Sequence, residues 1–174
     1  MLSKTNGEIL DQRQFNFGWE LPKGVVVAIP EYELSELIKN GETETVELKA
    51  TVGDPTEFAE TVVAFANLKG GVIIVGVDDQ TNVIGLDSRN HKDTITNIIS
   101  SHCEPPITYS IEERSLNEKR ILLVRIEEGH DKPYMLREKG PYIRANGTDR
   151  IATRFELDEF YHSRASAYPG FGRY

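Results

Sequence analysis

Apolar residues recur along this chain with two different spacings, and each spacing predicts a kind of element. Residues 45–49 alternate apolar with polar side chains, which predicts a strand that turns Val46 and Leu48 toward a core. Glu47 and Lys49 then share the opposite face of that strand. The strand therefore presents two charged side chains on one face.

Capping residues mark the expected starts of two helices. Residues 54–57 (Asp-Pro-Thr-Glu) combine an acidic N-cap, a proline at the first helical position and a glutamate three residues on. Apolar residues at helical spacing follow, and the glycine pair 70–71 ends the expected helix. Residues 153–156 (Thr-Arg-Phe-Glu) form a second capping box, which opens a last amphipathic helix through Leu157, Phe160 and Tyr161.

The fold class follows from the order of the expected elements. Residues 72–77 are a nearly unbroken apolar run, which predicts a central strand covered on both faces. The remaining pattern predicts a helix opened by Pro30, a return strand over 83–86, a helix over 91–102, and strands over 107–111, 121–126 and 142–144. Residues 1–29 are expected to form an arm with an edge strand over 25–29, residues 30–165 the domain, and residues 166–174 a flexible tail. The sequence therefore predicts an α+β fold, a mixed β-sheet with helices packed mainly on one face.

Length and composition favour one globular domain. The chain has 174 residues, of which 39% are hydrophobic and 28% charged. No apolar run reaches the roughly 18 residues of a membrane-spanning helix, and the first residues lack the apolar stretch of a secretory signal. We therefore expect a soluble, cytoplasmic protein with no membrane partner. Cys103 is the single cysteine, which excludes an internal disulfide and a cysteine-based zinc site.

Charge is unevenly distributed along the chain. The net charge of −8 argues against a nucleic-acid partner, because phosphate binding depends largely on lysine and arginine. Residues 1–100 carry 8 basic and 16 acidic residues, however, whereas residues 101–174 carry 12 of each. Within residues 132–154, six basic residues accompany only two acids. The fold can therefore place an acidic pocket beside a basic rim, or the charges can simply be scattered over a solvated surface.

The common catalytic and nucleotide-binding motifs are missing. The chain contains no P-loop, no Gly-x-Gly-x-x-Gly after a strand and no Gly-x-Ser-x-Gly. The four histidines form no His-x-x-x-His pair, which favours surface or capping roles for them.

Carboxylates at strand ends are the remaining candidates for chemistry. Glu47 and Lys49 share one strand face, Glu42 stands just before that strand, and Asp78 and Asp79 end the central strand. If the two strands are neighbours, the acids converge and need a cation such as Mg²⁺ or Mn²⁺ between them. Such a site can activate water toward a phosphodiester, with the lysine stabilising the transition state. An ordinary aspartate turn and a solvated strand face also explain the same residues.

Several segments follow one another in an order that resembles a known family. They are Glu44–Lys49, Ala64–Asp79, Val83–Leu86, Pro133–Tyr134 and Tyr142–Thr148. Together they resemble the Schlafen AlbA-type (AlbA_2) domain family over about residues 35–162. Glu47-Leu48-Lys49 stands where the family usually has Glu-Phe-Lys, and residues 67–71 stand where it has Asn-Thr-x-Gly-Gly.

The resemblance implies both a fold and a function. It implies an α+β fold similar to that of Alba chromatin proteins and a role in binding DNA or RNA, as part of a transcriptional regulator or a defence protein. A related core in eukaryotic Schlafens cleaves tRNA and rRNA with two glutamates, one aspartate and a divalent metal. Glu42 and Glu47 match the two glutamates, and Asp78 or, in preference, Asp79 matches the aspartate.

Two further segments have both a binding and a structural interpretation. The glycines of the 67–71 turn can expose backbone N–H groups to a phosphate, or the turn can simply cap a helix. Arg144, Asn146, Thr148 and Arg150 can hold backbone phosphates, or they can form a polar hairpin tip.

Our leading interpretation is a nucleic-acid-binding domain with DNA or RNA as its partner. Phosphate contacts are expected from Lys49, Lys132, Arg137, Lys139, Arg144, Asn146, Thr148 and Arg150. The first alternative is a metal-dependent endoribonuclease, with catalytic residues Glu42, Glu47, Lys49 and Asp79 and with Mg²⁺ or Mn²⁺ held by Glu42, Glu47, Asp78 and Asp79. No cofactor is expected outside that alternative.

The second alternative is a protein–protein assembly module, which the acidic N-terminal half suits. Eukaryotic Schlafens pair two related lobes, so the single lobe of this chain is expected to form a homodimer.

Overall fold

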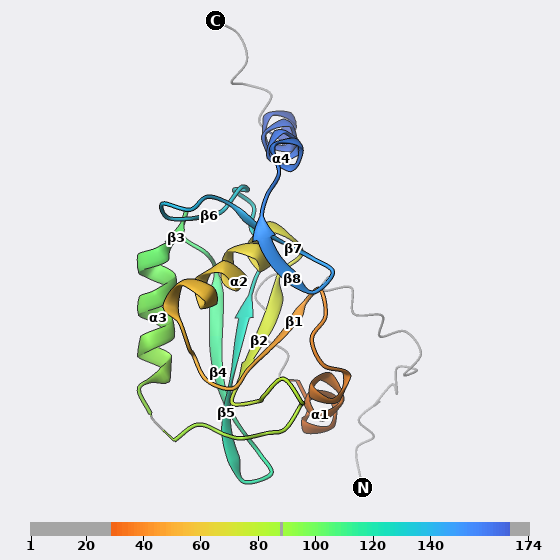
Figure 1. Ribbon diagram of the computed structural model, residues 1–174, viewed down its shortest axis with the longest axis vertical. Coiled ribbons are helices and arrows are strands. Elements are labelled where there is room, and N and C mark those ends of the chain that lie inside the picture. The colour runs from red at the N-terminus through yellow and green to blue at the C-terminus, as the bar shows by residue number, and fades with distance from the viewer. Residues whose placement is uncertain (1–28, 88, 168–174) are drawn as a thin grey trace, which may run out of the picture.

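A four-stranded mixed sheet organises the molecule (Figure 1). The computed structural model describes residues 29–87 and 89–167. The strand order is β1-β2-β5-β4, with β1 parallel to β2 and the other neighbours antiparallel. The strands are β1 (Val46–Lys49), β2 (Gly71–Val75), β4 (Tyr109–Leu116) and β5 (Lys119–Ile126). The chain therefore has the α+β fold with a mixed sheet that the sequence predicts.

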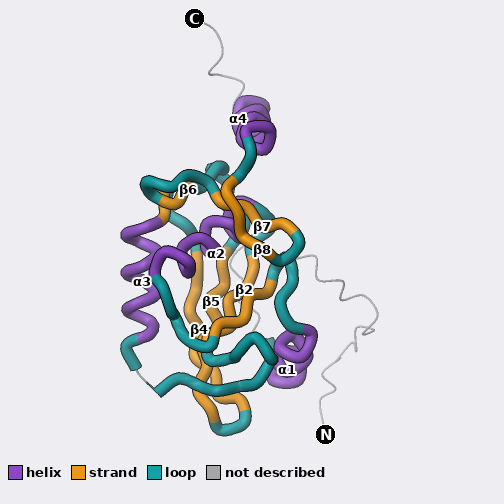
Figure 2. The backbone as a smooth tube through the Cα atoms, viewed as in Figure 1, coloured by secondary structure: helices purple, strands orange, loops and turns teal. Residues whose placement is uncertain are grey.

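Helices cover the two faces of the sheet unequally (Figure 2). The helices α2 (Pro55–Asn67) and α3 (His91–His102) pack on one face, where Phe58, Phe65 and Ile95 join Ile73 in one core. The shorter helix α1 (Glu31–Asn40) covers the other face with Leu34 and Ile38. The predicted orientation of β1 is confirmed, because Val46 and Leu48 belong to this second core.

Local capping explains where α2 begins and ends. Asp54 Oδ1 accepts hydrogen bonds from the backbone N–H groups of Thr56 at 2.8 Å and Glu57 at 3.1 Å, as the capping pattern predicts. Beyond the helix, Gly70 adopts a φ of +77°, and a Cβ there would lie 2.6 Å from Ile126 O. Only glycine allows the chain to turn so close to β5.

Two small strand pairs lie beyond the main sheet. The strands β3 (Cys103–Glu104) and β6 (Met135–Leu136) pair with each other, and β7 (Tyr142–Ala145) forms a hairpin with β8 (Thr148–Ile151). Asn146 and Gly147 both have positive φ, of 54° and 74°, as a two-residue hairpin turn requires. The hairpin packs against α2 near the end of the molecule from which the last helix projects (Figure 1).

Some predicted strand limits are wrong. The strand expected over 107–111 is β4, which begins later and continues to Leu116, because an edge strand tolerates charged side chains that hide its alternation. The strand expected over 72–77 ends at Val75, where Gly76 turns the backbone with a φ of +106°. The expected return strand over 83–86 reduces to one bridge between Val77 and Val83. The edge strand expected over 25–29 lies outside the described residues, apart from Ile29, and so does most of the tail.

The last helix, α4 (Arg154–Ala167), projects from the body of the molecule (Figure 1). Its predicted capping box is present, since Thr153 N donates to Glu156 Oε2 at 2.7 Å and Glu156 N donates to Thr153 Oγ1 at 3.4 Å. Phe155 and Tyr161 are exposed, so the amphipathic helix expected here does not bury them in this chain. Across the part of the chain that is described, no helix is long and apolar enough to cross a membrane.

Candidate functional site

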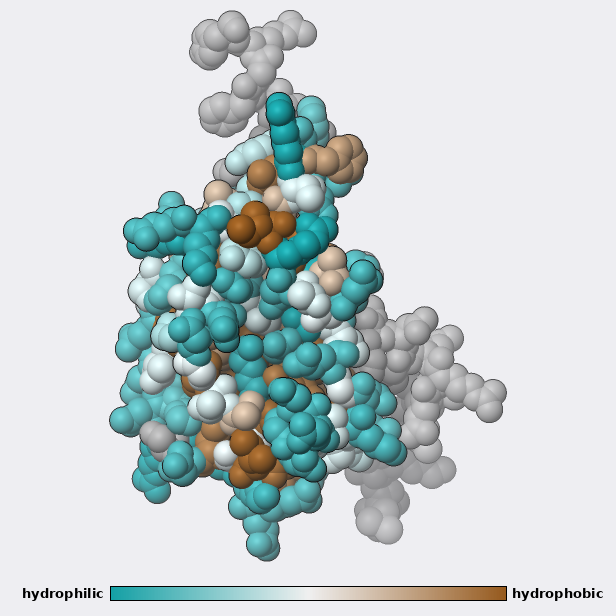
Figure 3. Space-filling model, viewed as in Figure 1, coloured by the Kyte–Doolittle hydropathy of each residue, from teal (hydrophilic) through white to brown (hydrophobic). Residues whose placement is uncertain are grey.

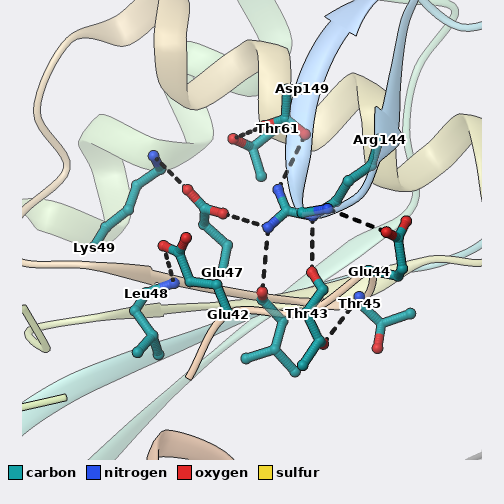
Figure 4. A network of polar contacts seen from close by, with 12 residues as sticks. Glu42, Thr43, Glu44, Thr45, Glu47, Leu48, Lys49, Thr61, Arg144 and Asp149 are labelled. Carbon is teal, nitrogen blue, oxygen red and sulfur yellow. Dashed lines mark hydrogen bonds and ion pairs between the residues drawn. The ribbon is translucent and has the colours of Figure 1, made fainter. Parts of the chain in front are cut away.

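Glu47 and Arg144 meet between the sheet edge and the β7–β8 hairpin (Figure 4). Glu47 lies beside Ile73 in the parallel β1–β2 register, on the face that α2 covers. Arg144 of β7 donates from Nη2 to Glu47 Oε2 at 2.7 Å, and the arginine side chain is only 1% exposed. The charged face of β1 is therefore neutralised inside the protein rather than solvated.

Asp149 holds the other arm of the same guanidinium. Arg144 Nη1 donates to Asp149 Oδ1 at 3.0 Å, and Thr61 Oγ1 of α2 donates to Asp149 Oδ2 at 2.7 Å. Neither Asp149 nor Thr61 is a candidate site residue from the sequence. Asp149 could have been predicted from the hairpin turn. A two-residue turn between Ala145 and Thr148 places Arg144 opposite Asp149 across the hairpin.

Backbone oxygens and an aromatic ring complete the surroundings of Arg144. Its Nε donates to Thr43 O at 2.9 Å, and its Nη2 also donates to Val46 O at 3.4 Å. The ring centroid of Phe65 lies 5.1 Å from Arg144 Cζ, a cation–π distance. The guanidinium is thus bound by a set of oxygen atoms from β1, from the segment before β1, and from β8.

The formal charges of this network balance. Lys49 Nζ donates to the second oxygen of Glu47, Oε1, at 3.0 Å. Arg144 and Lys49 therefore face two carboxylates, Glu47 and Asp149, and the four charges sum to zero. Buried charges are tolerated when they are paired and hydrogen-bonded in this way.

Burial and ion pairing oppose one another in the pKa values of this network. Burial by itself lowers the pKa of the Arg144 guanidinium, but Glu47 and Asp149 outweigh it, so that its pKa is raised above the ordinary value. Burial raises the pKa of the Asp149 carboxyl, although the hydrogen bonds from Thr61 and Arg144 act in the opposite direction. Arg144 consequently remains charged.

Glu42 lies near this network, just before β1. Its Oε1 accepts from Leu48 N at 3.4 Å. Burial raises the pKa of the Glu42 carboxyl, and the neighbouring charges of Glu47 and, more weakly, Asp79 raise it further. Glu42 is therefore within electrostatic reach of Glu47 and Asp79, the two acids that accompany it in the predicted catalytic set.

Asp78 belongs to a turn of its own. Its Oδ1 accepts from Gln80 N at 3.0 Å and from Asn82 N at 2.8 Å, and its Oδ2 accepts from Asn82 Nδ2 at 3.0 Å. These hydrogen bonds, led by that from the Asn82 side chain, lower the pKa of the Asp78 carboxyl. The aspartate therefore closes the loop after β2, as in the turn interpretation.

As arranged, these acids do not fit a divalent metal ion. Within residues 29–87 and 89–167, no three or more His, Cys, Asp or Glu residues form a group that could hold a metal. Both oxygens of Glu47 accept from cationic nitrogens, those of Lys49 and Arg144. Mg²⁺ and Mn²⁺ need several oxygen ligands that are free to turn toward the ion. As they stand, these residues therefore supply no divalent-metal site for a chemical step.

Three of the eight residues expected to contact phosphate are engaged within the protein. Arg144 is buried, and Lys49 is largely buried against Glu47. Lys132 Nζ donates at 2.6 Å both to Leu68 O and to Glu128 Oε1, so it holds the end of α2. The structure thus places these three cations where they support the fold.

The other five expected contacts face solvent, and we call them the basic surface: Arg137, Lys139, Asn146, Thr148 and Arg150. The side chains of Arg137, Lys139 and Arg150 are 53%, 47% and 43% exposed. Each forms an ion pair with a carboxylate, those of Glu104, Glu60 and Glu156 respectively. The view in Figure 3 shows a predominantly hydrophilic face with small apolar patches.

The glycine turn after α2 approaches protein backbone rather than an open space. Asn67 is 4% exposed, and its Nδ2 donates to Tyr134 O at 2.8 Å and to Tyr142 O at 2.9 Å. Its Oδ1 accepts from Tyr134 N at 2.6 Å. Together with the close approach of Gly70 to β5, these contacts favour the structural interpretation of the 67–71 turn. Asn67 fixes the start of β7 and hence the hairpin that carries Arg144.

Comparisons with known proteins agree with this fold. The family described as Schlafen, AlbA_2 matches residues 42–153, and because that match spans more than half of the sequence, the chain belongs to this family. No curated protein matches the sequence.

Two solved structures are similar in fold. The DIP2311 protein of Corynebacterium diphtheriae is 18% identical with a TM-score of 0.58, over 76% of this chain and 31% of that one. The N-terminal domain of a RecG-related protein of Nitrosomonas europaea, provisionally assigned as an ATP-dependent DNA helicase, is 22% identical with a TM-score of 0.51, over 73% of this chain and 94% of that one. This chain thus spans about a third of the length of the Corynebacterium protein.

Proposed function

We propose that this chain is a nucleic-acid-binding domain of a larger regulatory or defence protein, and that it contacts phosphates through the basic surface. The observation that carries the proposal is that three half-exposed cations and two exposed polar side chains occur within residues 137–150, in the turn that follows β6 and on the β7–β8 hairpin. Family membership supports it, because the resemblance to this family implies binding of DNA or RNA.

The ion pairs of the basic surface do not prevent phosphate binding. An exposed ion pair contributes only about 0–1 kcal/mol, so a phosphate can replace the carboxylate partner at low cost. Arg137 lies 3.6 Å from Glu104, and Lys139 lies 3.1 Å from Glu60. Arg137 and Lys139 are therefore available, whereas Arg150 is held more firmly, because its ion pair with Glu156 is bidentate. The net charge of −8 predicts that binding will be weak at high salt.

The buried network holds the β7–β8 hairpin, which carries part of the basic surface, in a fixed position. Arg144 and Asp149 connect the hairpin to β1, and Gly147 N donates to Glu44 Oε1 at 3.1 Å at the hairpin tip. Contacts on a rigid element keep their geometry better than contacts on a mobile loop. We infer that Arg144 positions the hairpin and that its neighbours Asn146, Thr148 and Arg150 meet the ligand.

Fluorescence anisotropy with labelled single-stranded RNA and DNA tests the proposal. The double variant Arg137→Ala/Arg150→Ala removes two phosphate contacts, so its binding should weaken for every sequence and its salt slope should fall by about 2. Lys39→Ala/Lys92→Ala removes two partly or fully exposed cations from other surfaces and should bind like the wild type. If the two double variants bind with equal affinity, the phosphate contacts lie outside the basic surface and the proposal is wrong.

The contacts of Glu47 favour binding over the alternative of a metal-dependent endoribonuclease. That alternative needs Glu42, Glu47 and Asp79 on one ion, whereas Glu47 is paired with two cations. Incubation of tRNA with Mn²⁺, comparing the wild type with Glu47→Ala, decides it. Loss of cleavage in a Glu47→Ala variant that circular dichroism shows to be folded would establish the nuclease in place of our proposal.

A further inference from the structure

Arg144 is surrounded by the kinds of ligand that usually bind a hard metal ion. Its guanidinium is held by two carboxylate oxygens, of Glu47 and Asp149, and by two backbone carbonyl oxygens, of Thr43 and Val46. Carboxylates and backbone carbonyls are typical ligands of Mg²⁺, Mn²⁺ and Ca²⁺. A guanidinium can satisfy the same oxygens because it offers five N–H donors in a fixed plane.

We infer that Arg144 acts as the resident cation of this site and takes the place that a divalent ion would occupy between Glu47 and Asp149. The chain therefore binds no divalent ion there unless the guanidinium is removed. The inference concerns the interior of the protein, so it is independent of whether the basic surface binds nucleic acid.

Charge balance supports the assignment. Arg144 and Lys49 balance the charges of Glu47 and Asp149, so a divalent ion placed between these two carboxylates would also face two cations. Removing Arg144 instead leaves two carboxylates against one lysine. An excess of buried negative charge is what a bound cation relieves.

Burial supports it as well. The Arg144 side chain is 1% exposed and packs over Phe65, which is itself fully buried. A divalent ion therefore has to displace a side chain held by four oxygens and a ring. Thr61, which donates to Asp149 on the far side, keeps that carboxylate pointed at the guanidinium.

Thermal unfolding with and without divalent ions tests the inference. The wild type should have the same Tm in EDTA and in millimolar MnCl₂. Arg144→Ala should have a lower Tm in EDTA and should gain about 5 °C in MnCl₂, since an ion that binds only the folded state stabilises it by mass action. The double variant Arg144→Ala/Glu47→Gln should lose this gain, because the ion then lacks one of its carboxylates.

Arg150→Ala is the matched control. It removes an arginine from the same hairpin, but one that is 43% exposed and paired with Glu156, so its Tm should not respond to MnCl₂. If Arg144→Ala is unfolded in EDTA, circular dichroism should show that MnCl₂ restores its structure. Failure of MnCl₂ to stabilise or refold Arg144→Ala overturns the inference, and so does a Glu47-dependent Tm gain in the wild type.

Discussion

A single guanidinium satisfies two carboxylates and two backbone carbonyls at the edge of the sheet. Arg144 therefore ties together three segments that are far apart in sequence, the approach to β1, β1 itself and the β7–β8 hairpin. Losing one partner of a buried ion pair costs about 3–5 kcal/mol, because the other charge remains buried without compensation. A single substitution in this network should therefore remove a large part of the stability of the protein.

Substitution of Glu42 should raise the stability of the protein, whereas substitution in the Arg144 network should lower it. Burial and the charges of Glu47 and Asp79 raise its pKa, so the folded state holds its proton more tightly than the unfolded state. Stability should consequently fall as the pH rises from its ordinary pKa of 4.5 through the raised value. Glu42→Gln keeps an acceptor for Leu48 N and should raise the stability at pH 7 by less than about 1 kcal/mol, but not at pH 4.

Urea unfolding at the two pH values checks this prediction. Glu36→Gln, on the exposed side of α1, is the control and should change little at either pH. A loss of stability in Glu42→Gln at pH 7 would show that the Glu42 charge is favourable where it stands.

At this scale the sequence singles out residues without predicting the contacts that they make. Glu47 and Arg144 are both candidates from the sequence, but as a metal ligand and a phosphate contact, whereas in the structure they neutralise each other. The reason is tertiary, since nothing in the chain between them indicates that the hairpin folds back over β1. Asp149 could have been found from the hairpin register, whereas Thr61 could not, because its contact depends on how α2 packs.

The elements differ in how firmly they are attached. Asn67 and Arg144 fix the β7–β8 hairpin at both ends of β7, while α4 projects beyond it and is linked to it through its first turn. In that turn Glu156 accepts from Arg150 Nη2 at 2.8 Å and from Thr153 N at 2.7 Å. The start of α4 is therefore linked to β8 by one carboxylate.

This link makes the start of α4 sensitive to acid. The hydrogen bonds from Arg150 and then from Thr153 lower the pKa of Glu156 from 4.5 to about 2. Its contribution to the stability of the turn is complete above pH 4.5 and is lost as the pH falls through about 2. NMR titration of the Thr153 amide should show that transition, and Glu156→Gln should abolish it. A midpoint near 4.5 would mean that the link does not form in solution.

Elements with local signals are well predicted, and elements that depend on partners are not. The caps at Asp54 and Thr153 and the turn at Asn146-Gly147 are confirmed because neighbouring residues alone determine them. The two-residue strands β3 and β6 carry no periodic pattern and exist only because they pair with each other. The limits of β4 are missed because the strand follows β5 along its whole length.

At the scale of the whole molecule, the homodimer stays a prediction. It comes from the pairing of two lobes in eukaryotic Schlafens, and the family match supports the comparison without testing the assembly. Light scattering at high protein concentration should give twice the chain mass of 19.6 kDa. A mass of one chain throughout the concentration range would exclude the dimer.

Charge is separated along the sequence of this chain. The excess of acidic over basic residues lies in residues 1–100, whereas the basic surface belongs to residues 137–150. A negatively charged protein can bind nucleic acid if its cations are gathered on one face, although repulsion from the remaining surface lowers the affinity. Such binding is necessarily sensitive to salt.

The salt dependence of RNA and DNA binding by the wild type tests the central claim most directly. Three phosphate contacts, from Arg137, Lys139 and Arg150, predict that the logarithm of the binding constant falls against the logarithm of salt concentration with a slope of about −2 to −3. Binding that is undetectable at low salt, or an affinity that does not change as salt rises, would contradict the account.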